Sequence, residues 1–190
     1  MNITLTKVHY CAALSDETNA FDAIVCVDAV PAFRVSNHGT GSCHDYHSLL
    51  PTDASLAEHR AWQDKLIAFV SALPRKSAPI PGHPDFTYPQ SLDTLVDDAF
   101  ADWLLEKDVA KYTKRMADRT LALNSKGQLV TMPKTRNLSS QMGWMDSNHP
   151  EFLILNKLPL ADATKGIRNA LRNASGSGQS DPHEGTRTMA

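Results

Sequence analysis

The stretch from Leu92 to Leu104 carries the most regular apolar pattern in the chain, and it limits what the chain can fold into. Ser91 stands where a helix N-cap is expected, and the following apolar side chains keep the i, i+3, i+4, i+7 spacing of one helical face: Leu92, Leu95, Val96, Ala99, Phe100, Trp103 and Leu104. A helix with a single apolar stripe must bury it against another element. We therefore expect a helix that packs on a second layer.

Two further helices are predicted on either side of this one. Ser55 and Glu58 match a capping box, and apolar residues recur at helical spacing from Leu56 until Pro74 ends the pattern. Near the C-terminus, the apolar positions between Leu160 and Leu171 indicate a final helix. The central helix begins with an acidic solvent face and continues into a basic run, Lys107 to Arg119, a polarity that suits the helix macrodipole.

The N-terminal segments predict strands instead. Residues 3–14 and 20–28 are rich in β-branched and aromatic side chains, and a polar turn at 15–19 separates them. A reversal at 28–31 leads to a short third strand at 32–36, which completes an antiparallel β-meander. A second hairpin is expected from 120–124 and 128–132 around Gly127, followed by a short strand at 152–155.

These elements together predict an α+β fold, with an N-terminal β-meander packed against amphipathic helices. We expect a single domain over residues 1–172. The proline-rich segment 74–90 is expected to be an extended connection without regular structure, and it is where two lobes would separate. Residues 173–190 contain almost nothing apolar and are expected to form a disordered tail.

The composition of the chain excludes few functional classes. A formal net charge of −2 does not by itself indicate a nucleic-acid partner. No apolar run is long enough to span a bilayer, and the N-terminus has no signal-peptide pattern, so we expect a cytoplasmic protein without a membrane partner. The three cysteines, Cys11, Cys26 and Cys43, are expected to be free thiols.

The segment Val35–His47 concentrates the side chains that could carry chemistry, because it holds three histidines, a cysteine, an aspartate and two glycines. We expect no cofactor, and the alternative is zinc, with His38, Cys43 and His47 as the candidate ligands and a fourth from water or from a distant residue such as His9 or His149. Cys43 and His44 are neighbours and point to opposite faces of an extended backbone, so His44 is an alternative to Cys43. The competing interpretation is that the imidazoles hydrogen-bond the backbone of an irregular loop.

Other interpretations of this and a neighbouring segment remain open. Gly39 and Gly41 could shape an anion-binding nest, although the spacing matches neither the phosphate loop nor the dinucleotide fingerprint. Cys43 could act as a nucleophile beside a histidine base. The basic run Lys107 to Arg119 could contact phosphates, or it could be a solvated helix face.

Several segments resemble a family of small proteins from bacteriophages and bacterial mobile elements. They are Ser15–Phe21, Val35–His47, Leu95–Met116 and Leu153–Pro159, and they carry a Ser-Glu-Thr-Asn-type turn, a glycine-rich segment after the third strand and a Leu-Asn-x-Leu-Pro motif. The chain departs from that pattern at Ala29 and at Ser42, where glycines are usual. The resemblance covers the chain up to about Leu171 and implies a compact accessory protein, without implying an activity.

From this resemblance we expect a protein that acts by binding more than by catalysis, modulating or inhibiting a bacterial defence complex in the manner of an anti-CRISPR protein. Its partner would be a protein of the host. The alternative is a metal-dependent enzyme or binding protein that acts on nucleic acid or nucleotides through the loop from His38 to His47, and a third hypothesis is a scaffolding component. The expected binding residues are Asn37, His38, Gly39, Gly41, His44, Tyr46 and His47.

Overall fold

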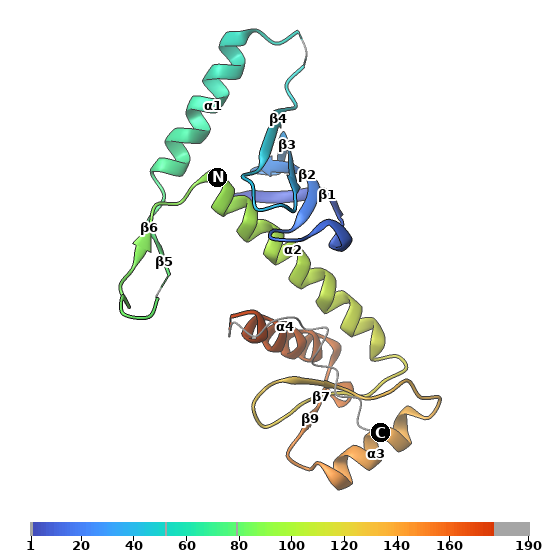
Figure 1. The fold of residues 1–190 in the computed structure, drawn as a ribbon. Coiled ribbons are helices and arrows are strands. Elements are labelled where there is room, and N and C mark those ends of the chain that lie inside the picture. The colour runs from blue at the N-terminus through green and yellow to red at the C-terminus, as the bar shows by residue number, and fades with distance from the viewer. Residues whose placement is uncertain (1, 52, 79, 177–190) are drawn as a thin grey trace. The chain divides into compact units, whose positions relative to one another are not determined.

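The chain divides after Asp102 into two compact units. The computed structural model describes residues 2–51, 53–78 and 80–176, and Figure 1 shows the elements of each unit. The division lies inside helix α2 (Leu92–Arg115), whereas the sequence placed a separation of lobes at the proline-rich segment 74–90. The elements are helices and antiparallel sheets, so the predicted α+β class is confirmed.

The N-terminal unit is built on a four-stranded antiparallel sheet in the order β1-β2-β3-β4, which confirms the predicted meander. Its strands are β1 (Ile3–Tyr10), β2 (Ala20–Val27), β3 (Val30–His38) and β4 (Asp45–Ser48). A short 3₁₀ turn, η1 (Ala12–Leu14), follows β1. Asp28 and Ala29 adopt φ values of 50° and 66°, as a tight hairpin turn requires. The sequence did not predict β4. This segment is a strand because it pairs with β3, and not because of its own strand propensity.

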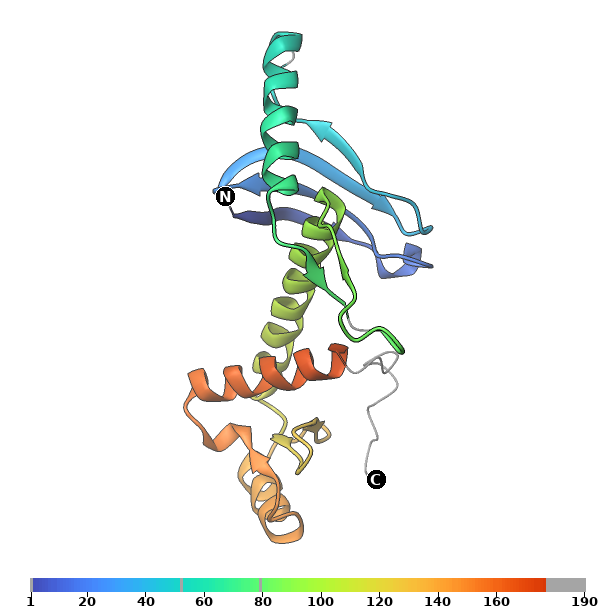
Figure 2. The same cartoon turned by 90° about the vertical axis from the view of Figure 1, so that its left-hand side faces the viewer.

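The two helices of this unit cover one face of the sheet. That inner face carries buried apolar side chains on β2 and β3, among them Val25 and Val35. Trp62 of α1 (Leu56–Ser71) meets the ring of Phe33 at 4.6 Å, and Phe100 of α2 stacks on Phe21 at 4.2 Å. Figure 2 shows α1 running beside the sheet. The predicted capping box at Ser55 is present.

The proline-rich segment differs from the expectation of an irregular connection. Its ends pair as a two-stranded sheet, β5 (Lys76–Ser77) with β6 (Thr87–Tyr88). The prolines lie outside the paired residues, so they remove no ladder hydrogen bond. Lys76 also forms an ion pair with Asp98 of α2, and this carboxylate raises the pKa of the Lys76 ammonium group. The segment is therefore attached to the N-terminal unit.

The C-terminal unit has a three-stranded sheet in the order β8-β7-β9, which confirms the second hairpin and the short strand after it. Its elements after α2 are β7 (Leu121–Leu123), β8 (Leu129–Thr131), α3 (Leu138–Asn148), β9 (Leu153–Ile154), the 3₁₀ turn η2 (Leu155–Lys157) and α4 (Leu160–Gly176). The sequence missed α3, because its serines, glycine and asparagines have low helix propensity. The helix is held instead by burial of Met145 against Ala122 and Ile154.

The boundary predicted at residue 173 for the start of the disordered tail is wrong. Residues 173–176, expected to begin a disordered tail, continue α4, whose buried residues Ala163 and Ile167 join a core cluster with Leu121 and Leu155. The rest of the expected tail, 177–190, lies outside the described residues. Within the part of the chain that the structure describes, no helix combines the length and apolar character that a membrane span requires.

Candidate functional site

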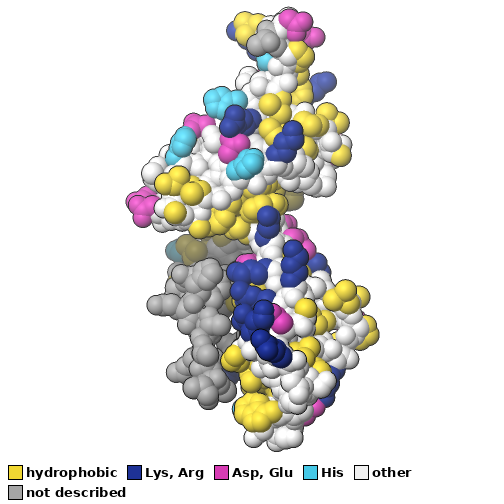
Figure 3. Space-filling model, turned by 90° about the vertical axis from the view of Figure 1, so that its right-hand side faces the viewer, with side chains coloured by type: hydrophobic (Ala, Val, Ile, Leu, Met, Phe, Trp, Pro, Cys, Tyr) yellow, Lys and Arg dark blue, Asp and Glu magenta, His cyan; other side chains and the backbone are white. Residues whose placement is uncertain are grey.

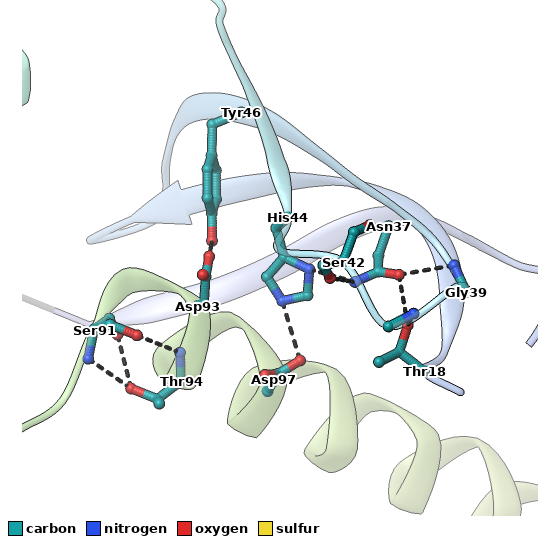
Figure 4. A network of polar contacts seen from close by, with 11 residues as sticks. Thr18, Asn37, Gly39, Ser42, His44, Tyr46, Ser91, Asp93, Thr94 and Asp97 are labelled. Carbon is teal, nitrogen blue, oxygen red and sulfur yellow. Dashed lines mark hydrogen bonds and ion pairs between the residues drawn. The ribbon is translucent and has the colours of Figure 1, made fainter. Parts of the chain in front are cut away.

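Asn37 is the centre of a polar network on the inner face of the N-terminal sheet, drawn in Figure 4. Its side chain is buried, and its Oδ1 accepts hydrogen bonds from the Thr18 hydroxyl at 2.9 Å and from the Gly39 backbone N–H at 2.8 Å. Its Nδ2 lies 3.0 Å from Nδ1 of His44 and 3.3 Å from the carbonyl oxygen of Ser42. One amide group thus joins the turn before β2 to the loop between β3 and β4.

His44 and Tyr46 extend this network to helix α2. The His44 side chain is only 4% exposed, and its Nε2 lies 3.0 Å from Oδ1 of Asp97. The Tyr46 hydroxyl donates a hydrogen bond of 2.6 Å to Oδ1 of Asp93. Burial, and then the Asp93 carboxylate, raise the pKa of Tyr46 above its usual value. Both side chains therefore connect the sheet to the first turns of α2, which is a structural role.

The two glycines of the loop are used by the chain itself. The Gly39 carbonyl accepts hydrogen bonds from the backbone N–H groups of residues 16, 17 and 18, at 2.9 to 3.3 Å. Gly39 has φ of +84°, and a Cβ there would lie 2.1 Å from the Leu14 carbonyl oxygen. The N–H groups of Gly39 and Gly41 donate to the side chains of Asn37 and Thr18. Both N–H groups already have partners within the chain, so the anion-nest interpretation stays a prediction that this geometry does not favour.

The opposite, outer face of the same sheet gathers polar and charged side chains. Strand register places Asp22 beside His9 and Ser36, and His47 beside Arg34, all on the face away from the aromatic core. They line a groove of about 470 Å³ together with His38 and Asp45, and its lining also includes Cys11, Leu14, Ala20, Phe21 and Asn37. Figure 3 shows histidines gathered around basic and acidic side chains on this unit. We call this surface the outer face and define it by His9, Asp22, Arg34, Ser36, His38, Asp45 and His47.

The charged groups of the outer face lie close to one another and to solvent. Nε of Arg34 contacts Oδ2 of Asp22 at 2.6 Å, with 57% of the Arg34 side chain exposed. Nε2 of His38 lies 3.5 Å from Oδ2 of Asp45, and the His38 side chain is 73% exposed. Exposed pairs of this kind contribute little to stability. The face therefore offers hydrogen-bond donors and both signs of charge on a rigid sheet.

The predicted zinc ligands are not assembled. Among the described residues, no group of three or more His, Cys, Asp or Glu side chains is placed to hold a metal ion. His38 and His47 both lie on the outer face, but the structure does not join them with Cys43, whose thiol is exposed and free. The zinc site stays a prediction that this geometry does not support.

The predicted binding residues thus separate into two groups. The structure places His38 and His47 on the outer face, whereas the other five act in the inner network and its turns: Asn37, Gly39, Gly41, His44 and Tyr46. Sequence reasoning missed His9, Asp22 and Arg34 as members of the outer face. The two-residue alternation of the strands was the signal that could have found them, because each lies between residues of the inner face.

Comparisons with known proteins assign no family to this chain. No protein-family model matches it, and neither does any curated protein or any solved structure.

Proposed function

We propose that this protein acts by binding a protein partner on the outer face of its N-terminal sheet. The partner would be a component of a bacterial host, and the protein would be an accessory factor of a bacteriophage or mobile element that modulates a host complex such as a defence complex. The resemblance described above supports this origin. The polar and charged side chains of the outer face support a binding role.

The separation of the two faces carries the proposal. The inner network uses buried donors and acceptors to fix the loop against α2, so the backbone of β3 and β4 is held in place. Arg34 and His38 project from this fixed backbone into solvent beside Asp22 and Asp45. A surface that is ordered before binding loses less conformational entropy when a partner docks.

The chemistry of the outer face fits a polar protein surface. A guanidinium group and the imidazoles supply directional donors, and the two carboxylates supply acceptors, so the face can pair with groups of either charge. Arg34 lies in the middle of this set, beside Asp22 on one side and His47 on the other. Arginine is enriched among the residues that dominate binding energy at interfaces. Arg34 and His47 are therefore the residues to change first.

A capture experiment with a matched control tests the proposal. The tagged full-length chain is incubated with host lysate, and the captured proteins are quantified by mass spectrometry for the wild type and for Arg34→Ala/His47→Ala. The control is His59→Ala/Arg60→Ala, which removes the same two residue types from helix α1 of the same unit.

We expect one stoichiometric host complex to be captured by the wild type and by the control, and its recovery to fall at least about tenfold with the outer-face variant, since a tenfold loss is about 1.4 kcal/mol and truncation of an arginine at an interface hot spot costs about 2 kcal/mol or more. Equal recovery with both variants, or recovery of copies of this chain alone, would contradict the proposal.

A further inference from the structure

The two units carry opposite charge, which the small net charge of the whole chain conceals. Residues 1–102 contain six Lys and Arg against thirteen Asp and Glu, a formal charge of −7. Residues 103–190 contain thirteen Lys and Arg against eight Asp and Glu, a formal charge of +5, and the described part, 103–176, carries twelve against six, a formal charge of +6. A basic excess of this size on about 70 residues is the electrostatic footprint of a surface that binds polyanions.

Most acidic side chains of the C-terminal unit are paired with basic side chains of the same unit, and the formal charge given above already includes them. Glu106 accepts two hydrogen bonds from Arg168, at 2.7 and 2.9 Å. The guanidinium group of Arg168 lowers the pKa of Glu106. Other ion pairs join Asp118 to Lys134, Asp146 to Lys157 and Asp108 to Lys111. Among the basic residues outside these pairs, Lys107, Lys114, Lys126, Arg136 and Lys165 are exposed.

Two helices present this charge. Lys107, Lys111 and Lys114 are exposed and follow one another at the i, i+4, i+7 spacing of a single face of α2. On α4, Arg168 and Arg172 follow at i, i+4; Arg168 contacts Glu106 of α2, and Arg172 also lowers the pKa of Glu106, so both arginines lie near the turn of α2 that includes Lys107. Figure 3 shows Lys and Arg side chains forming a band on this unit. We call this surface the basic band.

Helix stability explains only part of the basic band. Lys114 is in the last turn of α2, where a cation favours the helix macrodipole. Lys107 and Lys111 lie further back in α2, and no basic residue occupies the last turn of α4. The helix macrodipole therefore does not explain Lys107 and Lys111 of α2 or the arginines of α4. Contact with a row of phosphate groups would explain them. Lys107 and Lys114 are about 10 Å apart along the helix, a length over which each strand of duplex DNA carries about three phosphates.

The aromatic rings in this region favour a double-stranded ligand over a single-stranded one. The Lys107 ammonium group lies 4.9 Å from the centre of the Trp103 ring, and the Arg115 guanidinium group lies 5.0 Å from that of Tyr112. Tyr112 also packs against the core cluster of the unit. Single-strand binding proteins leave aromatic faces open for bases to stack. Here cations cover the rings, so backbone phosphates are what this surface can contact.

We infer that the basic band of the C-terminal unit binds the phosphate backbone of double-stranded nucleic acid, through Lys107, Lys111 and Lys114 of α2 and Arg168 and Arg172 of α4. This site is separate from the outer face of the N-terminal sheet. Recognition of this kind depends on phosphate spacing and does not depend on base sequence.

Fluorescence anisotropy with the full-length chain tests the inference. The probes are labelled 20-base-pair DNA and RNA duplexes and a single strand of the same length, titrated between 50 and 200 mM salt. The variant Lys111→Ala/Lys114→Ala removes two charges from the basic band. Its matched control, Arg60→Ala/Lys65→Ala, removes two exposed charges from helix α1 of the N-terminal unit. Alanine maintains helix propensity in both.

We expect the wild type and the control to bind both duplexes more tightly than the single strand, with affinity that falls as salt rises. The variant should bind at least about tenfold more weakly at 100 mM salt, and its log–log salt slope should be smaller by about 1.8, or 0.9 for each lost phosphate contact. Circular dichroism verifies that the variant remains folded.

Vesicles that contain anionic lipid are titrated in parallel. The inference would be overturned by no duplex binding at 50 mM salt, by equal weakening in the control, by stronger binding to the single strand, or by binding to the vesicles alone. Self-association at low salt that Lys111→Ala/Lys114→Ala abolishes, without duplex binding, would identify the acidic unit of a second copy as the ligand and would likewise overturn it.

Discussion

The two faces of the N-terminal sheet use the same residue types in opposite ways. His44 projects to the inner face, where Asn37 and Asp97 hold its two ring nitrogens and its side chain is 4% exposed. His38 lies six residues earlier on the outer face, and its side chain is 73% exposed. The role of each histidine therefore depends on its burial and its hydrogen-bond partners, and it does not follow from membership of a histidine-rich segment.

This comparison also separates stability from binding. Inner-face side chains should be sensitive to substitution, because their removal leaves cavities or unpaired polar groups. Outer-face side chains are exposed, so their removal should change binding and leave the fold intact.

The largest effect is expected at Phe100, the α2 residue that stacks on Phe21 and is 2% exposed. Phe100→Ala leaves a cavity between the helix and the inner face and should destabilise the N-terminal unit by about 4 kcal/mol. Urea unfolding followed by circular dichroism measures the change. A loss below about 1 kcal/mol would mean that α2 does not cover this face.

Asn37→Ala should have the next largest effect, about 3 kcal/mol, because several buried groups lose their partner at once, including the Gly39 N–H and the Thr18 hydroxyl. Ser36→Ala is the matched control, since Ser36 is the neighbouring residue and belongs to the outer face. The control should change the free energy of unfolding by less than about 0.5 kcal/mol. Similar losses in both variants would remove the distinction between the faces.

Tyr46→Phe should cost about 1.5 kcal/mol at neutral pH, because it deletes the charge-assisted hydrogen bond to Asp93 and keeps the ring. Since the folded protein raises the pKa of Tyr46 above its usual value of 10.0, this group stabilises the fold fully below about pH 10 and loses that contribution as the pH rises further. Denaturation measured between pH 8 and pH 11 should show a steeper alkaline loss for the wild type than for Tyr46→Phe. Parallel curves would contradict the buried position of this hydroxyl.

The smallest effect on stability is expected for His38→Ala and His47→Ala. Exposed side chains of this kind usually change the free energy of unfolding by no more than about 0.5 kcal/mol. Thermal unfolding of each variant measures the change, with His44→Ala as the sensitive counterpart on the inner face. If His47→Ala were as damaging as His44→Ala, His47 would be a structural residue.

Periodicity made most of the fold predictable. The alternation at 3–36 and the helical spacing after Ser55 and Ser91 depend on local pattern, and each gave an element of the right type. Strand β4 and helix α3 could not be predicted in this way. Strand β4 forms through its pairing with β3, and helix α3 is stabilised by the burial of Met145. Both elements therefore depend on contacts between residues that are distant in sequence.

The candidate site was harder to predict for a related reason. The sequence singled out the segment Val35–His47, but the face to which each side chain points depends on strand register. The alternation along each strand puts Asp22 and Arg34 on the outer face, but only the register brings them beside each other and beside His47. The charge difference between the units was present in the sequence, but it was hidden until the boundary after Asp102 was known.

Chemical modification of the histidines tests the distinction between the faces most directly. The folded chain is treated briefly with diethyl pyrocarbonate, and modification at each histidine is quantified by mass spectrometry, with and without the captured host partner. We expect His38 and His47 to react readily in the free protein and to become protected by the partner, whereas His44 should react only after unfolding. Modification of His44 at the rate of His47 in the folded chain would contradict this expectation.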